Sequence, residues 1–289
     1  MTTEADALRV FAPAKINLFL HVGEKRADGF HALESLVVFA RAGDELTFAP
    51  AGGLSLSIDG PFAAGLDQGP DNLVMKAARM LMTRAGVIKG ARIVLTKNLP
   101  VASGIGGGSA DAAATLRGLT QLWGLNASQE ELRRIGEALG SDVPVCVDSR
   151  CAWMEGRGEK VTMLNGYPNV PMVLVNPGVG VSTGKMFAAL KERRGVGLPI
   201  PPAMNGAAEL VDYLGTTSND LEAPAREAVP VIGEVLDALS AQPGALLSRM
   251  SGSGATCFAL FEDAEQAQEA ATVLRARHND WWIVPTTTS

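Results

Sequence analysis

Residues 100–111 read Pro-Val-Ala-Ser-Gly-Ile-Gly-Gly-Gly-Ser-Ala-Asp and hold four glycines within five positions. Glycine adopts positive φ at little steric cost and lets the backbone come close to a ligand. The next residues place Ala112, Leu116, Leu119 and Trp123 at helical spacing, which predicts an amphipathic helix starting beside the glycines. Free N–H groups and the positive end of the helix dipole favour an anion there. The stretch therefore predicts a phosphate-binding loop. A flexible surface loop is the alternative, and the flanking strand-like and helix-like runs disfavour it.

The loop differs from the better-known glycine-rich loops. A Walker loop needs Lys followed by Ser or Thr after its last glycine, but this run continues Ser109-Ala110-Asp111. A dinucleotide-binding fingerprint needs a glycine at its sixth position, where this sequence has Ser109. The His-Arg-Asp and Asp-Phe-Gly motifs of protein kinases do not occur. The chemistry of those three families is therefore not predicted.

Composition predicts a globular protein with a small partner. The 289 residues, 47% of them apolar, can bury one large domain or two smaller ones. A net charge of −6 disfavours a broad nucleic-acid surface. Three cysteines without a CxxC spacing fit a reducing cytoplasm. No apolar run reaches the about 18 to 20 residues that span a bilayer, and the first residues do not resemble a signal peptide. We therefore expect a soluble cytoplasmic protein.

Two charged residues stand out in apolar surroundings. Lys15 is the lone lysine of a strand-like run over residues 8–22. A buried ammonium needs an anion, so Lys15 is expected to face a phosphate or a carboxylate, although an edge-strand lysine that prevents aggregation is an alternative. Asp142 follows a helix end and precedes an apolar run, a position at which most aspartates cap a helix. From the residues alone, capping is the favoured role of Asp142.

Periodicity and turn residues predict the other elements. Strands are expected at residues 33–39, twice within 46–58, and at 91–96, 172–176, 256–261 and 281–284. Asp71 is expected to cap a helix over residues 73–84, and Ser128 with Glu131 forms a capping box for the next helix. Further helices are expected at residues 219–225, 231–239 and 264–277. Residues 179–185 are expected to form a plain loop, and residues 195–206 a surface excursion.

Three short motifs in this order resemble the GHMP family of small-molecule kinases, named after galactokinase, homoserine kinase, mevalonate kinase and phosphomevalonate kinase. They are residues 13–18 (Pro-Ala-Lys-Ile-Asn-Leu), the loop at 100–110, and residues 251–254 (Ser-Gly-Ser-Gly). The resemblance implies an α+β fold of two domains with the active site in the cleft between them. An ATP-binding domain like domain 2 of ribosomal protein S5 is expected at residues 1–163, and a C-terminal GHMP kinase domain of α/β type at 164–289.

The resemblance also implies an activity and its residues. Residues 26–31, 140–145 and 218–221 are similar to those of members that use ATP to phosphorylate a cytidine-diphosphate-bearing alcohol. Asp142 then takes the catalytic base position, with Lys15 beside it, and Mg²⁺ bridges the phosphates, with Ser109 its candidate protein ligand. The sequence identifies no glutamate ligand for the metal. The implied ATP-binding residues are Lys97, Pro100, Val101, Ala102, Ser103, Gly104, Ile105, Gly106, Gly107, Gly108, Ser109 and Ala110.

For the substrate, the resemblance places Phe30 and Phe187 on either side of the cytosine, and His31 at its polar edge. Asn17, Thr183 and Asp142 are expected beside the reacting hydroxyl. A small-molecule partner, no nucleic acid, no membrane, and a monomer or weak homodimer are expected. Two alternatives stay open: a homoserine or mevalonate type kinase of the same family, and a nucleotide-binding protein without catalysis.

Overall fold

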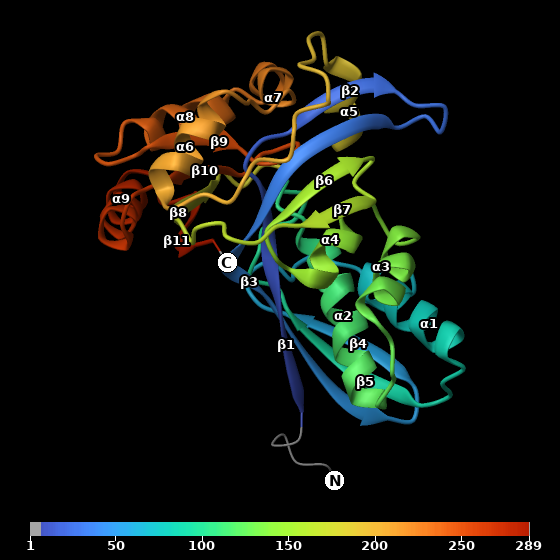
Figure 1. The fold of residues 1–289 in the computed structure, drawn as a ribbon. Coiled ribbons are helices and arrows are strands. Elements are labelled where there is room, and N and C mark those ends of the chain that lie inside the picture. Colours follow the sequence, from blue (N-terminus) through green and yellow to red (C-terminus); the bar gives the residue numbers. More distant parts are fainter. Residues whose placement is uncertain (1–6, 289) are drawn as a thin grey trace. The chain divides into compact units, whose positions relative to one another are not determined.

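The computed structural model describes residues 7–288, which divide into two compact units (Figure 1). Unit 1 holds residues 7–14, 43–101 and 106–149, and unit 2 holds residues 15–42, 102–105 and 150–288. The glycine-rich stretch is therefore divided between the two units. The boundary expected at residue 163 concerns sequence domains rather than these units, and it stays a prediction.

Unit 1 combines strands with four helices. Its strands are parts of β1 (Leu8–Asn17) and β3 (His31–Ala51), with β4 (Leu54–Asp59) and β5 (Gly90–Thr96). β5 pairs antiparallel with β3 and parallel with β4, and a helix makes the crossover that a parallel pair needs (Figure 1). The helices are α1 (Leu73–Ala85), α2 (Gly107–Trp123), α3 (Gln129–Glu137) and α4 (Val143–Asp148).

Helix α2 is the central helix of unit 1, since it packs against α1, α3 and α4. The apolar face predicted from its spacing is confirmed, because Ala112, Leu116, Leu119 and Trp123 are all buried. Each large apolar side chain buried in this way stabilises the fold by about 1.5–3 kcal/mol. Gly118 lets the helix approach β3, because a Cβ there would lie 2.3 Å from the Phe48 ring.

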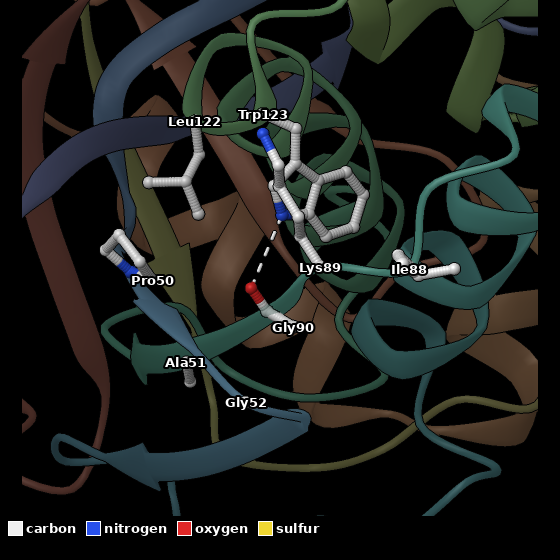
Figure 2. A pocket seen from close by; sticks show the side chains of 8 residues that line it. All are labelled: Pro50, Ala51, Gly52, Ile88, Lys89, Gly90, Leu122 and Trp123. Carbon is white, nitrogen blue, oxygen red and sulfur yellow. Dashed lines mark hydrogen bonds between the residues drawn. The ribbon is translucent and has the colours of Figure 1, made fainter.

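A shallow pocket of about 340 Å³ lies at the C-terminal end of α2 (Figure 2). Its lining comes from the ends of β3, β5 and α2, and Trp123 donates its indole N–H to the Gly90 carbonyl beside it. Trp123 is the last residue of a helix of 17 residues, so the pocket lies about 25 Å from the glycine-rich end of α2. The pocket therefore does not belong to the phosphate-binding loop.

Unit 2 contains a four-stranded antiparallel sheet of order β11-β8-β10-β9. A second group of strands surrounds residues 31–37 of β3, which pair antiparallel with β2 and with β6. The antiparallel pairing of β2 with β3 forms a hairpin between residues 22 and 33. The strands of unit 2 not yet named are β2 (His21–Lys25), β6 (Ala152–Gly156), β7 (Lys160–Met163), β8 (Pro171–Asn176), β9 (Leu247–Met250), β10 (Cys257–Leu260) and β11 (Trp282–Thr287).

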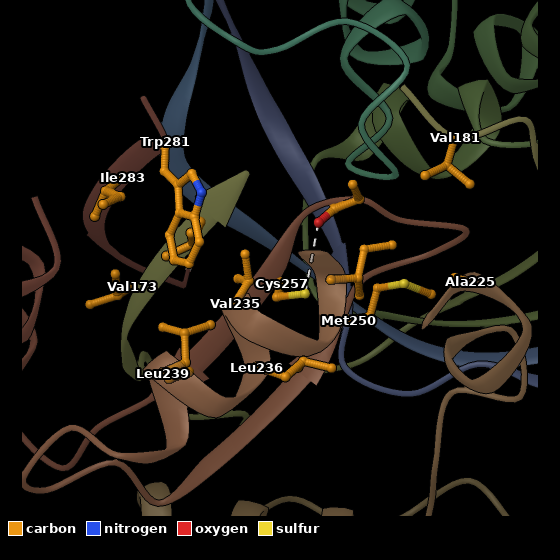
Figure 3. Close-up of a cluster of buried hydrophobic side chains, with 14 of the residues drawn as sticks. Val173, Val181, Ala225, Val235, Leu236, Leu239, Met250, Cys257, Trp281 and Ile283 are labelled. Atoms are coloured by element: carbon orange, nitrogen blue, oxygen red, sulfur yellow. Dashed lines mark hydrogen bonds between the residues drawn. The ribbon is translucent and has the colours of Figure 1, made fainter. Parts of the chain in front are cut away.

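Helices cover this sheet and bury an apolar core (Figure 3). Helix α8 packs against β9 and β10, and α9 packs against β8 and β11. Figure 3 shows Trp281, Leu239 and Met250 among the side chains of the core, and Trp281 is 9% exposed. The helices of unit 2 are α5 (Thr183–Ala189), α6 (Ala207–Gly215), α7 (Glu222–Ala228), α8 (Val231–Ser240) and α9 (Ala264–Arg277).

The structure corrects the prediction of separate strands at residues 33–39 and 46 onward. These residues belong to one strand, β3, which continues through Gly43. Gly43 does not form a turn. It lies so close to β1 that a Cβ would be 2.4 Å from the Ala12 carbonyl oxygen. Glycine here permits a close approach of two backbones, which from sequence alone looks like a turn signal.

Two further predictions were wrong in detail, and one helix was not predicted. Asn72, not Asp71, caps α1, since its side chain accepts the Val74 N–H at 2.8 Å. Both residue types are good N-caps, so sequence did not separate them. Residues 183–185 form the first turn of α5 rather than a loop, and α6 was not predicted. The capping box of Ser128 and Glu131 is confirmed, and residues 195–206 form no helix or strand, as predicted.

Candidate active site

The backbone of the glycine-rich loop adopts conformations that suit a phosphate. Ala102, Gly104 and Gly106 have φ of 51°, 76° and 64°, in the left-handed region that glycine tolerates best. Gly106 is the N-cap residue of α2 and offers no side chain to cap the helix. The first N–H groups of α2 are therefore not satisfied by a capping side chain, which is the arrangement that binds anions at helix N-termini.

Exposure varies along the predicted ATP-binding residues. Val101, Ala102 and Gly108 are exposed, and Gly104, Gly106, Gly107 and Ser109 are half-buried. Lys97 and the remaining four are buried, namely Pro100, Ser103, Ile105 and Ala110.

In unit 2 the three motifs that carry the family resemblance meet through backbone contacts. The Lys15 N–H donates to the Ile105 carbonyl at 2.9 Å. The Asn17 N–H donates to the Ser251 hydroxyl at 3.1 Å, and that hydroxyl donates to the Gly104 carbonyl at 3.1 Å. Motifs that are more than eighty residues apart in the sequence thus form one site.

Lys15 and Asn17 are held in a fixed arrangement at this meeting point. Both are nearly fully buried, at 3% and 1% exposure. The Lys15 ammonium donates to the Asn17 side-chain oxygen at 2.7 Å, and the Asn17 amide donates to the Ser35 hydroxyl at 2.8 Å. Ser35 in turn donates to the Phe19 carbonyl at 2.5 Å. This chain of hydrogen bonds fixes the Asn17 amide orientation, so its oxygen faces the ammonium.

Asp142 lies in unit 1, where it directly precedes α4. It occupies the N-cap position of α4, but its φ of −88° and ψ of −11° are helical, and its side chain does not cap the helix. The capping role favoured from the residues alone is therefore wrong. Asp142 is half-buried. Its pairing with Lys15 stays a prediction.

Lys97 lies in a buried charge cluster of unit 1. Its ammonium donates to Asp44 Oδ2 at 2.5 Å and to Asp111 Oδ2 at 2.6 Å. Burial lowers the pKa of Lys97, but the carboxylates of Asp111 and Asp44 outweigh it, so the pKa lies above its ordinary value and the ammonium stays charged. A direct contact between Lys97 and ATP stays a prediction, and the ammonium already bonds two carboxyl groups.

Asp44 and Asp111 were not identified from the sequence as functional residues. Asp111 stands at the end of the glycine-rich stretch without a signal of its own, and Asp44 lies 53 residues from Lys97, so no local spacing rule connects them.

The predicted cytidine-binding residues all lie in unit 2. The rings of His31 and Phe187 are stacked, with centroids 5.6 Å apart and planes 10° apart. His31 Nδ1 lies 3.2 Å from the Gly23 carbonyl oxygen. A carbonyl oxygen only accepts, so Nδ1 carries the proton, and in neutral His31 Nε2 is an acceptor.

Phe30 is the most exposed of the predicted aromatic residues, at 49%. The Arg157 guanidinium lies 5.3 Å from the centre of its ring, within reach of a cation–π interaction. Thr183, at the start of α5, shares a hydrogen bond of 2.8 Å with the Ser253 hydroxyl. Thr183 is thereby joined to the Ser-Gly-Ser-Gly motif.

Residues 7–288 contain neither a metal-binding cluster of acidic, His or Cys side chains nor a membrane-spanning helix. No group of three or more His, Cys, Asp or Glu side chains in this part of the chain could hold a metal ion by itself. No helix of the same residues has the length and apolar composition needed to cross a membrane.

Comparison with known proteins assigns this fold and site to a class. The family described as GHMP kinases N terminal domain matches residues 72–150, and GHMP kinases C terminal matches residues 202–280. The chain belongs to the GHMP kinase family. The predictions of this family, of its α+β fold and of an ATP-dependent kinase for a small molecule are confirmed.

Individual relatives carry a more specific name. A protein of Parvibaculum lavamentivorans named 4-diphosphocytidyl-2-C-methyl-D-erythritol kinase is 52% identical over 275 residues, covering 94% of this chain and 95% of the relative. A protein of the same name from Dinoroseobacter shibae is 50% identical, covering 96% and 93%.

Solved structures agree with these relatives. A crystal structure of 4-(cytidine 5'-diphospho)-2C-methyl-D-erythritol kinase is 32% identical with a TM-score of 0.79, covering 98% of this chain and 99% of that one. Homoserine kinase from Cytophaga hutchinsonii, at 21% identity and a TM-score of 0.69, covers 100% and 96% and shares the fold.

Proposed function

We propose that this chain transfers the γ-phosphoryl group of ATP to the 2-hydroxyl of 4-diphosphocytidyl-2-C-methyl-D-erythritol, giving the 2-phosphate and ADP. This reaction belongs to the non-mevalonate, methylerythritol phosphate route to isoprenoid precursors. Relatives of this name cover almost the whole chain at about half identity. The observation that carries the proposal is the meeting of Lys15, Asn17 and Ser251 with the carbonyls of Gly104 and Ile105.

The triphosphate is proposed to lie on the backbone N–H groups of residues 100–110. The left-handed turns at Gly104 and Gly106 and the uncapped start of α2 support this, because they present N–H donors and a helix dipole to an anion. Mg²⁺ fits such a site through the phosphate oxygens, since it prefers oxygen ligands and keeps several waters. The half-buried Ser109 hydroxyl is the protein oxygen proposed to reach it. Bound there, the ion would offset negative charge on the phosphates.

Phosphoryl transfer to an alcohol depends mainly on positioning and on charge stabilisation. The 2-hydroxyl oxygen bonds to the γ-phosphorus, the bond from that phosphorus to the β-phosphate oxygen breaks, and ADP leaves. Asp142 is proposed to orient the hydroxyl and to accept its proton. Lys15 is proposed to offset charge on the transferring group, and its bond to Asn17 supports a fixed ammonium position. Thr183 is proposed to lie beside the same hydroxyl.

The cytosine is proposed to stack against Phe30 and Phe187, with His31 at its polar edge. The exposed Phe30 ring is accessible to a base, and base stacking on an aromatic ring contributes about 1–3 kcal/mol. Because His31 Nδ1 faces the Gly23 carbonyl, the acceptor Nε2 matches the exocyclic amine of cytosine, which is a donor. This pairing supports cytosine over uracil, whose corresponding group is an acceptor.

The domain boundary at residue 163, the cytoplasmic location, the absence of a nucleic-acid partner and a monomeric or weakly dimeric state are further proposals. The net charge of −6 supports the third of these.

The test is ADP production from ATP and Mg²⁺ with three acceptors: 4-diphosphocytidyl-2-C-methyl-D-erythritol, homoserine and mevalonate. We expect turnover with the first alone. Turnover with homoserine or mevalonate instead would support the alternative kinases of the family. ATP binding without phosphorylation of any of the three would contradict the proposal and support a non-catalytic nucleotide-binding protein.

Removing the Phe30 ring should weaken binding of the cytidine substrate. For Phe30→Ala we expect KM for 4-diphosphocytidyl-2-C-methyl-D-erythritol to rise by about 10-fold to 100-fold, the scale of one lost stacking contact. KM for ATP should not change. Phe30→Tyr keeps the ring and is the matched control, with KM values near the wild type. Steady-state kinetics with each substrate varied separately would measure this, and an unchanged KM in Phe30→Ala would exclude Phe30 from the cytosine site.

A further inference from the structure

Three charged side chains of unit 1, Asp44, Lys97 and Asp111, form a buried cluster. Their exposed fractions are 0%, 4% and 3%. Each comes from a different element: Asp44 from β3, Lys97 from the residue after β5, and Asp111 from the beginning of α2. Removing three charges from water is costly, and a buried ion pair is weak evidence for stability by itself. A contribution to stability alone therefore does not account for the cluster, and the parts of the chain that it contacts become informative.

The cluster contacts the chain on both sides of the glycine-rich loop. Before the loop, Asp44 Oδ1 accepts the N–H groups of Asn98 at 2.6 Å and Leu99 at 2.8 Å. After the loop, the Lys97 ammonium lies beside Gly107, where a Cβ would be 3.1 Å from Nζ. Asp111 belongs to the second turn of α2 and bonds the same ammonium. The cluster thus joins the residues that enter the loop to the helix that leaves it.

We infer that Asp44, Lys97 and Asp111 are positioning residues that hold the start of α2 and the backbone at residues 98–99 in place for the nucleotide phosphates. They act through the backbone and need not touch the nucleotide. The inference rests on the proposed assignment of this loop to ATP. It predicts that disturbing the cluster weakens nucleotide binding while binding of the acceptor alcohol is unaffected.

Lys97 bonds one oxygen of each of the two carboxyl groups, Asp44 Oδ2 and Asp111 Oδ2. Asp111 Oδ1 is buried without a hydrogen-bond partner among the residues that the structure describes. Because a buried polar atom without a partner is costly, the bond from Lys97 to Asp111 Oδ2 helps to offset the burial of this side chain. Lys97 therefore links Asp111, and with it the start of α2, to Asp44.

The decisive measurement is calorimetric titration with ADP, without acceptor. Asp44→Asn keeps the shape of the side chain but removes the charge that pairs with Lys97 and that accepts the N–H groups of Asn98 and Leu99. We expect its Kd for ADP to rise about tenfold or more. Asp148→Asn removes the carboxylate that pairs with Arg133 at another place in unit 1, and its Kd should equal that of the wild type.

Lys97→Met tests the positional role directly. It leaves two carboxylates without their shared ammonium, and we expect its Kd for ADP to rise about tenfold or more. KM for the acceptor alcohol should stay within about twofold of the wild type, as no contact between the cluster and the acceptor is proposed. Wild-type ADP affinity in Lys97→Met or in Asp44→Asn would overturn the inference. Because ADP binding is measured without acceptor, a chain that binds ADP as expected but phosphorylates no alcohol contradicts only the proposed function.

Asp44→Asn is the second variant if Lys97→Met does not fold, because it keeps a side chain of the same shape at position 44. Thermal unfolding of each variant without ligand would show that it is folded at the temperature of the titration.

Discussion

Asp142→Asn is expected to lower kcat by about 100-fold or more while leaving ADP affinity nearly unchanged. Asparagine keeps the shape of the side chain and one acceptor oxygen, but it cannot take the proton of the attacking hydroxyl. The structure favours this reading over a loss of stability, because the Asp142 side chain does not cap α4. Single-turnover measurement of ADP formation with saturating ATP and acceptor would report the chemical step.

Asp237→Asn is the matched control for this experiment. Asp237 is an exposed carboxylate on α8 that is not a proposed site residue, and its conversion makes the same chemical change. Its kcat and Tm should equal those of the wild type. A fully active Asp142→Asn would remove Asp142 from the mechanism, and a large loss in Asp237→Asn would show that the assay reports general damage.

The helical face of α2 could be predicted from sequence because it depends only on local spacing. Ala112, Leu116, Leu119 and Trp123 repeat with the helical period, and all four are buried. The role of Gly43 could not be predicted in this way. Its spacing does not distinguish a turn from a strand that passes close to the Ala12 backbone, and that contact depends on how β1 and β3 are arranged.

The candidate site also combines features that the sequence predicts with contacts that only the fold shows. The order of the three motifs indicated the family, but the hydrogen bonds from Lys15 to Ile105 and from Asn17 to Ser251 are contacts between distant residues. The charge partners of Lys97 are even harder to predict from the sequence, since Asp44 is one of 31 acidic residues and nothing in the local sequence connects it to Lys97. The local pattern therefore predicts that Lys97 precedes the loop, whereas the charged neighbours of Lys97 can be identified only from the tertiary structure.

Gly104→Ala should impair both stability and ATP binding, because Gly104 lies in close contact with the Ser-Gly-Ser-Gly motif. A Cβ at this position would lie 2.5 Å from the Ser251 carbonyl oxygen and 2.7 Å from the Gly254 nitrogen. These are backbone atoms, so relief requires a shift of one of the two segments. Overpacking of this kind costs about 1–3 kcal/mol, which corresponds to a fall in Tm of several degrees. We also expect KM for ATP to rise by about tenfold or more, as a shift of the loop misplaces its N–H groups.

Gly124→Ala separates the steric clash from backbone strain. Gly124 ends α2 with φ of 66°, close to the 76° of Gly104, but a Cβ there meets no atom within 4 Å. Both variants bear the cost of a left-handed alanine, roughly 1 kcal/mol, and only Gly104→Ala adds the collision with residues 251–254. The two should therefore lose some stability in common, whereas only Gly104→Ala should lose ATP affinity. Equal kinetics in both variants would mean that the contact between the loop and residues 251–254 does not position the nucleotide.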